Sequence, residues 1–167
     1  PCCDRYTYGD DHAIKAGPLS ELKAGDYVLF YATLTVRESA PWLPPRWGAF
    51  VIGHFRLAQD ALTGEEYVDL DAQEQAPFAT NAHVRREKTD GRVFLLGDPD
   101  DSALYDRAVP LSRPTGGSDP NPLVTRLSDD SGKGPWWRRP LRFDSAATPK
   151  LLAVCDSARS GLGNYQV

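Results

Sequence analysis

A chain of 167 residues, of which 41% are hydrophobic and 25% charged, is long enough to bury the core of a globular domain. Its formal net charge of −4 excludes a protein that coats nucleic acid through bulk positive charge, so a nucleic-acid contact has to use a local patch. The longest apolar stretches, such as residues 27–34, are too short to span a bilayer, and we expect neither a signal peptide nor a membrane partner.

The first predicted element is a short helical turn over residues 18–26, closed by Gly25, because glycine supplies the left-handed conformation that ends a helix. Residues 27–36 (YVLFYATLTV) are rich in aromatic and β-branched side chains, which predicts a buried strand. A Pro/Trp-rich loop is expected at residues 39–46. Residues 47–57 then predict a second strand, paired antiparallel with the first.

The rest of the chain predicts shorter elements. They are bulges or close approaches at Gly48 and Gly53, strands at 67–70, 92–96 and 109–111, a short helix from Asp101 or Ser102 to Arg107, surface loops at 113–121 and 128–134, and short apolar segments at 141–143 and 151–154. Short strands punctuated by Gly and Pro predict a single α+β domain over residues 1–167, built as a small β-barrel with short helices and long loops.

The cysteines and the missing methionine bear on compartment and completeness. Three cysteines, two of them adjacent, make a poor disulfide framework and favour reduced thiols in a cytoplasmic protein: Cys2, Cys3 and Cys155. Because the sequence contains no methionine, even at position 1, we expect that residues preceding Pro1 are missing from this numbering.

Two runs of residues resemble a known family. Leu22 to Tyr31 (LKAGDYVLFY), followed by Trp47 to Phe55 (WGAFVIGHF), resembles the PUA-like group (named for pseudouridine synthase and archaeosine transglycosylase), and within it the EVE and YTH-like domains. The likeness covers residues 18–57. It implies a small β-barrel that holds RNA or a modified base in an aromatic-lined pocket.

A second resemblance covers more of the chain. Gly97-Asp98-Pro99 with Ser102, Arg107 to Pro110 (RAVP) and Gly134 to Arg138 (GPWWR) are similar to the third type of nucleotide modification associated domain. That family implies a link to the modification of nucleotides. Neither resemblance supplies a catalytic set that maps onto these positions.

The segment from Lys133 to Arg142 is the most unusual in the sequence, since it combines four cations with two indoles in an acidic protein. Trp136 and Trp137 can stack on bases, and Arg138 and Arg139 offer forked donors to phosphate or guanine. The alternative is structural: one indole fills the core, and the arginines pair with surface carboxylates.

Two further motifs carry candidate ligand-binding residues. Trp42 and Trp47 flank a proline-stiffened loop, which suits one wall of a base pocket or, equally, a lid that seals the core. Asn81, His83 and Arg85, with Arg86 beside them, gather groups that read a base edge or hold phosphate. The competing interpretation of these four residues is a polar, solvated loop or strand edge.

Metal binding and catalysis have weaker signals. His12, His54 and His83 lack a partner pair of cysteines, because Cys2 and Cys3 are adjacent and have no spacer. The carboxylates form acidic runs typical of solvated faces: Asp10, Asp11, Glu65, Glu66, Asp69 and Asp71. There is no Gly-x-Ser-x-Gly elbow and no phosphate-cradling Gly-rich loop, so we expect no metal, no cofactor and no catalytic residue.

The sequence therefore favours a domain that binds nucleic acid or a modified nucleotide through an aromatic and basic pocket. The predicted binding residues are Trp42, Trp47, Asn81, His83, Arg85, Trp136, Trp137, Arg138 and Arg139. Two alternatives stay open: an enzyme of nucleotide or base modification, and a protein-interaction module whose partner surface is the proline loop around Trp42.

Overall fold

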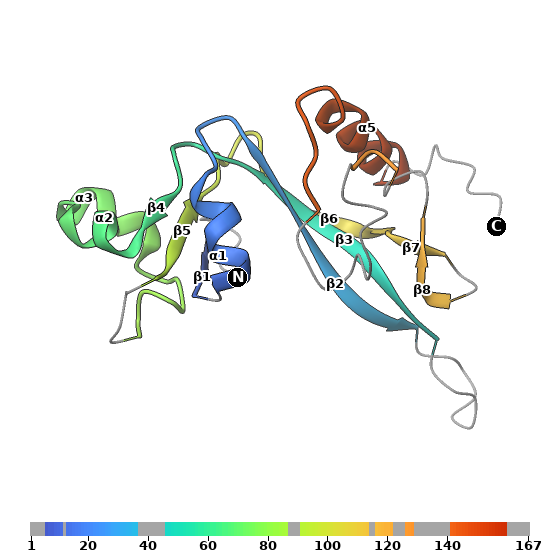
Figure 1. Ribbon diagram of the computed structural model, residues 1–167, viewed down its shortest axis with the longest axis horizontal. Coiled ribbons are helices and arrows are strands. Elements are labelled where there is room, and N and C mark those ends of the chain that lie inside the picture. The colour runs from blue at the N-terminus through green and yellow to red at the C-terminus, as the bar shows by residue number, and fades with distance from the viewer. Residues whose placement is uncertain are drawn as a thin grey trace. The chain divides into compact units, whose positions relative to one another are not determined.

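The computed structural model describes residues 6–11, 13–36, 46–86, 91–113, 116–121, 126–128 and 141–159. Its elements are β1 (Thr7–Asp10), α1 (Ala13–Ser20), β2 (Tyr27–Val36), β3 (Arg46–Arg56), β4 (Leu62–Thr63), α2 (Gly64–Asp69), α3 (Ala72–Gln75), the 3₁₀ helix η1 (Ala76–Phe78), β5 (Val93–Leu96), β6 (Ala103–Pro110), β7 (Ser112–Arg113), β8 (Gly116–Pro120) and α5 (Thr148–Arg159). They are labelled in Figure 1. The predicted α+β class is confirmed.

The chain forms two compact units, each made of two separate segments. Unit 1 comprises Pro1–Val28 and His54–Leu104, and unit 2 comprises Leu29–Gly53 and Tyr105–Val167. The described residues form three sheets, with the strand orders β1-β5-β4, β2-β3-β6 and β7-β8. Within the described residues these sheets do not close on themselves, so the predicted barrel is not confirmed. The single-domain assignment stays a prediction.

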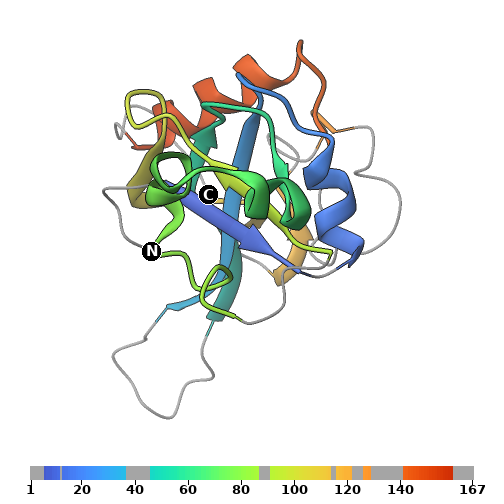
Figure 2. The same ribbon diagram turned by 90° about the vertical axis from the view of Figure 1, so that its left-hand side faces the viewer.

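Unit 1 is built around β5, whose side chains alternate between two apolar clusters because successive residues of a strand face opposite sides. Val93 and Leu95 pack with Leu57 and with Ala16 of α1. Phe94 packs on the other side, in the cluster described next. In Figure 1, α1 and the α2–α3 segment lie on different sides of β5. In Figure 2, the α2–α3 segment faces the viewer.

Three aromatic rings fill the second cluster of unit 1. Tyr67 lies 4.8 Å from Phe94 and 5.7 Å from Phe78, between ring centroids. Phe78 and Phe94 are fully buried. Tyr67 belongs to α2, so the strand predicted at residues 67–70 is wrong.

Paired caps explain why this segment is helical. The Thr63 hydroxyl accepts the Glu66 N–H, and the Glu66 carboxylate accepts the Thr63 N–H, a capping box at the start of α2. Asp71 and Glu74 repeat the arrangement at α3. Both caps are local signals, and they outweigh the strand preference of Tyr67 and Val68.

Unit 2 packs α5 onto strands β3 and β6. Leu151 and Cys155, four residues apart on one helix face, join Ala49, Val51 and Val109 in a buried apolar core. Asp144 fixes the approach to α5, since its carboxylate accepts N–H groups of the next turn at 2.6 and 2.9 Å. The short apolar segment expected at residues 151–154 is therefore part of a twelve-residue helix.

The predicted strand bounds and glycine positions agree with the structure closely, though not completely. Strand β2 has the predicted bounds, and β3 and β5 differ from theirs by one residue. Gly25 has a φ of +88°, which confirms the tight turn before β2, although the helix before it runs from Ala13 to Ser20. A Cβ at Gly48 would lie 2.9 Å from the Ser112 hydroxyl, so this glycine permits the predicted close approach.

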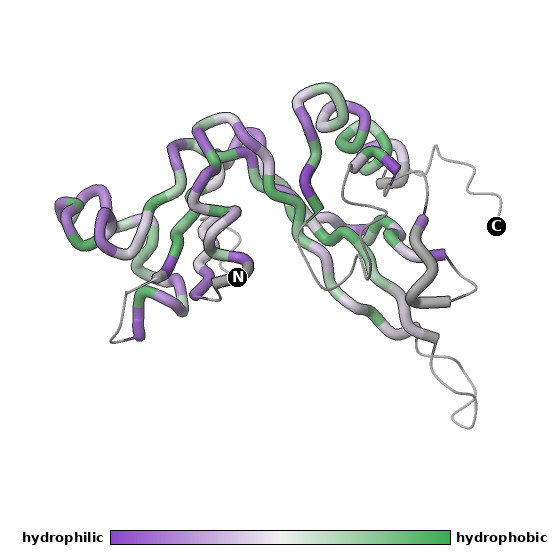
Figure 3. Tube along the Cα trace, in the orientation of Figure 1, coloured by the Kyte–Doolittle hydropathy of each residue, from purple (hydrophilic) through white to green (hydrophobic). Residues whose placement is uncertain are grey.

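Two predictions after β5 are wrong. The helix expected to begin at Asp101 or Ser102 is strand β6, because the Ser102 hydroxyl accepts the backbone N–H of Arg56 instead of capping a helix. The loop expected over residues 113–121 includes Arg113 of β7 and all of β8. Figure 3 shows hydrophobic stretches along β3 and β5, and hydrophilic ones at α2 and α3.

Candidate functional site

A turn at residues 81–86, which follows η1 in unit 1, carries three of the predicted site residues: Asn81, His83 and Arg85. The Asn81 backbone N–H donates to the carbonyl of Phe78 at 2.8 Å. Its side-chain oxygen accepts the His83 N–H at 2.9 Å, so Asn81 is buried and shapes the turn. This side chain acts as an internal turn template, a common use of asparagine.

Gly9 of β1 lets this turn lie directly against the sheet. A Cβ built at Gly9 would lie 2.9 Å from His83 Cβ and 3.1 Å from Asn81 Oδ1. Such distances require the neighbouring atoms to shift. The absence of a side chain at position 9 is therefore a condition for the present position of His83.

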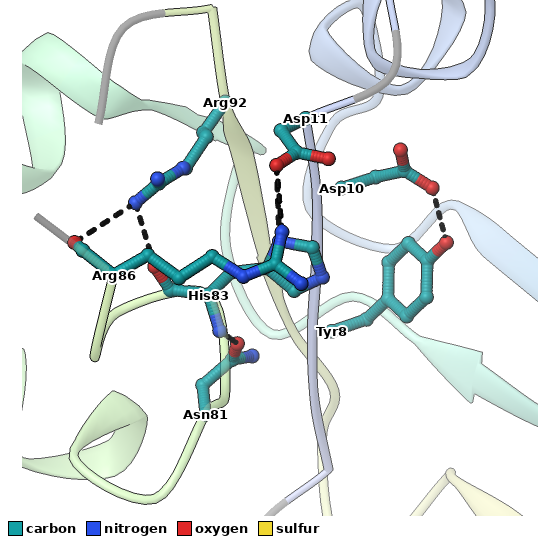
Figure 4. Close-up of polar contacts among 7 residues, drawn as sticks. All are labelled: Tyr8, Asp10, Asp11, Asn81, His83, Arg86 and Arg92. Carbon is teal, nitrogen blue, oxygen red and sulfur yellow. Dashed lines mark hydrogen bonds and ion pairs between the residues drawn. The ribbon is translucent and has the colours of Figure 1, made fainter. Parts of the chain in front are cut away.

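Arg92, the residue before β5, binds the backbone of the turn. It is only 5% exposed, and its guanidinium donates to the carbonyl oxygens of His83 at 2.7 Å and of Arg86 at 3.3 Å. These bonds satisfy two carbonyl groups of the turn, and a charged donor makes them stronger than neutral hydrogen bonds. The backbone of the turn is thus fixed at both ends (Figure 4).

One carboxylate oxygen of Asp11 faces two nitrogen atoms of the turn, one from Arg86 and one from His83. Asp11 Oδ2 accepts from Arg86 Nη1 at 2.8 Å and lies 4.0 Å from His83 Nδ1, as Figure 4 shows. The longer distance exceeds that of a hydrogen bond. Within the described part of the chain, His83 Nδ1 is a buried polar atom without a hydrogen-bond partner. A buried polar atom without a hydrogen bond costs about 1–3 kcal/mol.

Tyr8 and Asp10 form a second polar pair on the opposite side of β1 from the turn, because Gly9 between them is the residue that faces His83 (Figure 4). The Tyr8 hydroxyl donates to Asp10 Oδ2 at 2.5 Å, and Asp10 is buried. Burial first, and then the hydrogen bond and the charge of Asp10, raise the pKa of Tyr8 well above its ordinary value of 10.0. Tyr8 is therefore a neutral hydrogen-bond donor throughout the physiological range.

The charge of this cluster is positive, in contrast to the chain as a whole. Three guanidiniums stand against two carboxylates: Arg85, Arg86 and Arg92 against Asp10 and Asp11. Arg85 is exposed and forms no ion pair with any residue that the structure describes. About a quarter of the His83 side chain is exposed, and this surface belongs to atoms other than the buried Nδ1. The turn thus presents cations and an imidazole edge to solvent.

The remaining predicted site residues lie elsewhere. Trp47 is in β3 of unit 2, with 47% of its surface exposed, which leaves its ring available to a ligand. The other predicted residues lie outside the described residues: Trp42, Trp136, Trp137, Arg138 and Arg139. Their convergence on one pocket stays a prediction.

A second Arg–Asp pair in unit 1 provides a useful contrast. Arg56 Nη1 lies 2.9 Å from Asp101 Oδ2, and the His54 ring contacts the backbone oxygen of Asp101 at 3.0 Å. Arg56 is the last residue of β3 and precedes Leu57, which pairs with Gly97 near the Thr7 end of β1. Asp11 follows the opposite end of β1. The described residues contain no group of three potential ligands that would suit a metal ion, and no helix long and apolar enough to cross a membrane.

Comparison with known proteins identifies the family. The model of nucleotide modification associated domain 3 matches residues 1–153. The chain belongs to this family. The match includes β1, the turn at residues 81–86 and β5, so the polar cluster lies within the matched region. No curated protein and no solved structure matches the chain.

The family assignment confirms the second of the two resemblances seen in the sequence, whereas the placement in the PUA-like group is not confirmed. The name of the family associates its members with nucleotide modification.

The sequence did not mark three residues of the site: Gly9, Asp11 and Arg92. Asp11 resembled a solvated acidic run, and Arg92 resembled an ordinary first residue of a strand. Asp11 and Arg92 come close together because their neighbours, Asp10 and Val93, are paired between β1 and β5.

Proposed function

We propose that this domain binds nucleic acid or a nucleotide, in the context of nucleotide modification, and that the turn at residues 81–86 contacts phosphate. The observation that carries the proposal is the cationic turn itself, a local positive patch in a protein of net charge −4. An acidic protein that binds nucleic acid needs such a patch. The name of the family supports the same class of ligand.

The residues of the turn divide into support and contact. Asn81 and Arg92 fix the backbone, so the contact groups are held without a large loss of side-chain entropy on binding. Arg85 and Arg86 offer donors to phosphate oxygens. His83 remains the candidate for reading a base edge, whereas the buried Asn81, expected from the sequence to share that role, belongs to the support.

The aromatic part of the proposal rests on the tryptophans. Trp47 is exposed enough to stack on a base. Trp42, Trp136 and Trp137 are proposed as further stacking walls, and Arg138 and Arg139 as further phosphate contacts. A cytoplasmic location, inferred from the cysteines, and the PUA-like barrel belong to the same proposal.

Fluorescence anisotropy with labelled twelve-nucleotide DNA and RNA, single-stranded and duplex, tests the proposal at several salt concentrations. We expect saturable binding that weakens with salt. Arg85→Ala should weaken binding to all sequences alike and reduce the salt slope by about 0.7–0.9, because one phosphate contact is lost. Trp47→Ala should weaken binding about 5- to 150-fold if the indole stacks on a base.

The matched control is Arg56→Ala, which removes an exposed arginine from the opposite end of β1. It should leave the salt slope unchanged. Absence of binding to every oligonucleotide and to free nucleotides, in a folded sample, would reject the proposal and favour a protein partner instead.

A further inference from the structure

Arg85 and Arg86 are adjacent arginines of the same turn, yet their surroundings differ. Arg86 is paired with Asp11 at 2.8 Å, whereas Arg85 has no carboxylate partner in the described residues. The Asp11 oxygen that pairs with Arg86 is also the oxygen nearest His83 Nδ1, at 4.0 Å. A single anionic oxygen therefore lies between two groups that a phosphate would use.

The Asp11 carboxylate fills this position incompletely. It leaves His83 Nδ1 without a hydrogen bond, so one donor or acceptor of the site is unsatisfied. A phosphate group carries more oxygens than a carboxylate and reaches two donors at once. An incoming phosphate oxygen can therefore satisfy both the guanidinium and the imidazole.

The surrounding structure allows Asp11 to leave. Both members of the pair are exposed, 43% for the Asp11 side chain and 56% for that of Arg86, and exposed ion pairs are weak. The backbone of the turn is held by Arg92 and Asn81, not by Asp11. Movement of Asp11 thus exposes a site that is already formed.

We propose that the Asp11 carboxylate is an internal competitor, which occupies the position of a ligand phosphate beside Arg86 and His83 and is displaced when a phosphorylated ligand binds. This inference rests on the proposed function and names the chemistry of the anchor: a phosphate monoester or diester. Asp11 then sets a threshold of affinity, so that weakly bound anions do not occupy the site.

The test is Asp11→Asn, which keeps the size of the side chain and removes its charge. Affinity for a fluorescein-labelled twelve-nucleotide single-stranded DNA, and for inorganic pyrophosphate as its competitor, should rise about three- to tenfold. The gain comes from the lost exposed ion pair and the removed repulsion between carboxylate and phosphate. The gain should disappear in Asp11→Asn/Arg86→Ala, because Arg86 is the group that Asp11 releases.

Asp101→Asn is the matched control, since it removes the same charge from the other exposed Arg–Asp pair. It should change affinity less than twofold. An unchanged or lower affinity of Asp11→Asn, while the wild-type protein binds DNA with a clear salt dependence, would overturn the inference and leave the proposed function standing. Equal gains in Asp11→Asn and Asp101→Asn would reduce the effect to net charge and also overturn it. Failure of every variant to bind either probe would reject both.

Discussion

The two units use their buried polar groups differently. In unit 1, Arg92 and Asn81 are buried to fix a turn that carries exposed cations, and His83 Nδ1 has no partner among the described residues. In unit 2, the buried serines bind backbone: the Ser112 hydroxyl accepts the Ala49 N–H, and the Ser128 hydroxyl donates to the carbonyl of Arg142.

This difference distinguishes buried polar groups that stabilise the fold from those that hold a turn with exposed cations. Buried serines that satisfy backbone groups beside an apolar core, Ser112 and Ser128 in unit 2 and Ser102 in unit 1, stabilise the fold. Polar groups that hold a turn in place and leave one atom unsatisfied have a cost that folding does not explain. We therefore expect unit 1 to contact the ligand phosphate, and we propose the exposed Trp47 of unit 2 as a stacking contact with a base.

The largest expected effects come from removing the centre of each core. Phe94→Ala in unit 1 should cost about 3–5 kcal/mol of unfolding free energy, and Leu151→Ala in unit 2 about 2–5 kcal/mol, because both side chains are fully or almost fully buried. Hydrogen exchange measured by mass spectrometry should then rise most in the unit that carries the substitution.

Val68→Ala is the control, since this side chain is 59% exposed in α2 and its loss should cost little. If both core variants raise exchange equally in all segments, the two units unfold as one cooperative block. That result would support the single-domain prediction and weaken the contrast drawn between the units.

A smaller effect is expected where the turn meets β1. Gly9→Ala places a Cβ 2.9 Å from His83 Cβ, so the turn has to shift, at a cost of about 1–3 kcal/mol and with loss of oligonucleotide binding. Chemical denaturation and anisotropy measure the two effects. Gly17→Ala is the matched control, because nothing lies within 4 Å of its added Cβ and alanine favours the helix. Unchanged binding in Gly9→Ala would show that the ligand does not need the turn in this position.

The smallest effect concerns pH and Tyr8. Its raised pKa keeps the folded state protonated above pH 10.0, where the unfolded chain releases the proton. The unfolding free energy should therefore fall as pH rises above about 10, by less than about 1.4 kcal/mol per pH unit for this group. Tyr8→Phe should make the decline shallower. Equal slopes for the two proteins in urea titrations at pH 9 to 11 would contradict this assignment.

The sequence predicted the fold best where local signals and packing agree. Residues 27–36 combine strand propensity with burial, and β2 has the expected bounds. At residues 67–70 the strand propensity of Tyr67 predicts the wrong element, because the capping box formed by Thr63 and Glu66 starts a helix there. The helix α5 also had a readable start in Asp144 and Pro149, with Leu151 and Cys155 on one face.

The site was predictable only in part, for a geometric reason. Asn81, His83 and Arg85 are close together in sequence, so composition alone marks them. Asp11 lies 75 positions from Arg86, and their contact follows from sheet register, which a single sequence does not reveal. Ser102 shows the same limit, since its partner Arg56 is 46 positions away.

The interleaving of the two units has a consequence for how the chain folds during synthesis. All residues of unit 1 are available once Leu104 has been made, whereas the segment Leu29–Gly53 has to wait for Tyr105 and the residues after it. The apolar strands β2 and β3 therefore leave the ribosome long before α5 exists to cover their core face. Nascent chains of intermediate length expose these strands to aggregation, and any shortened version that ends near residue 104 retains that exposure permanently.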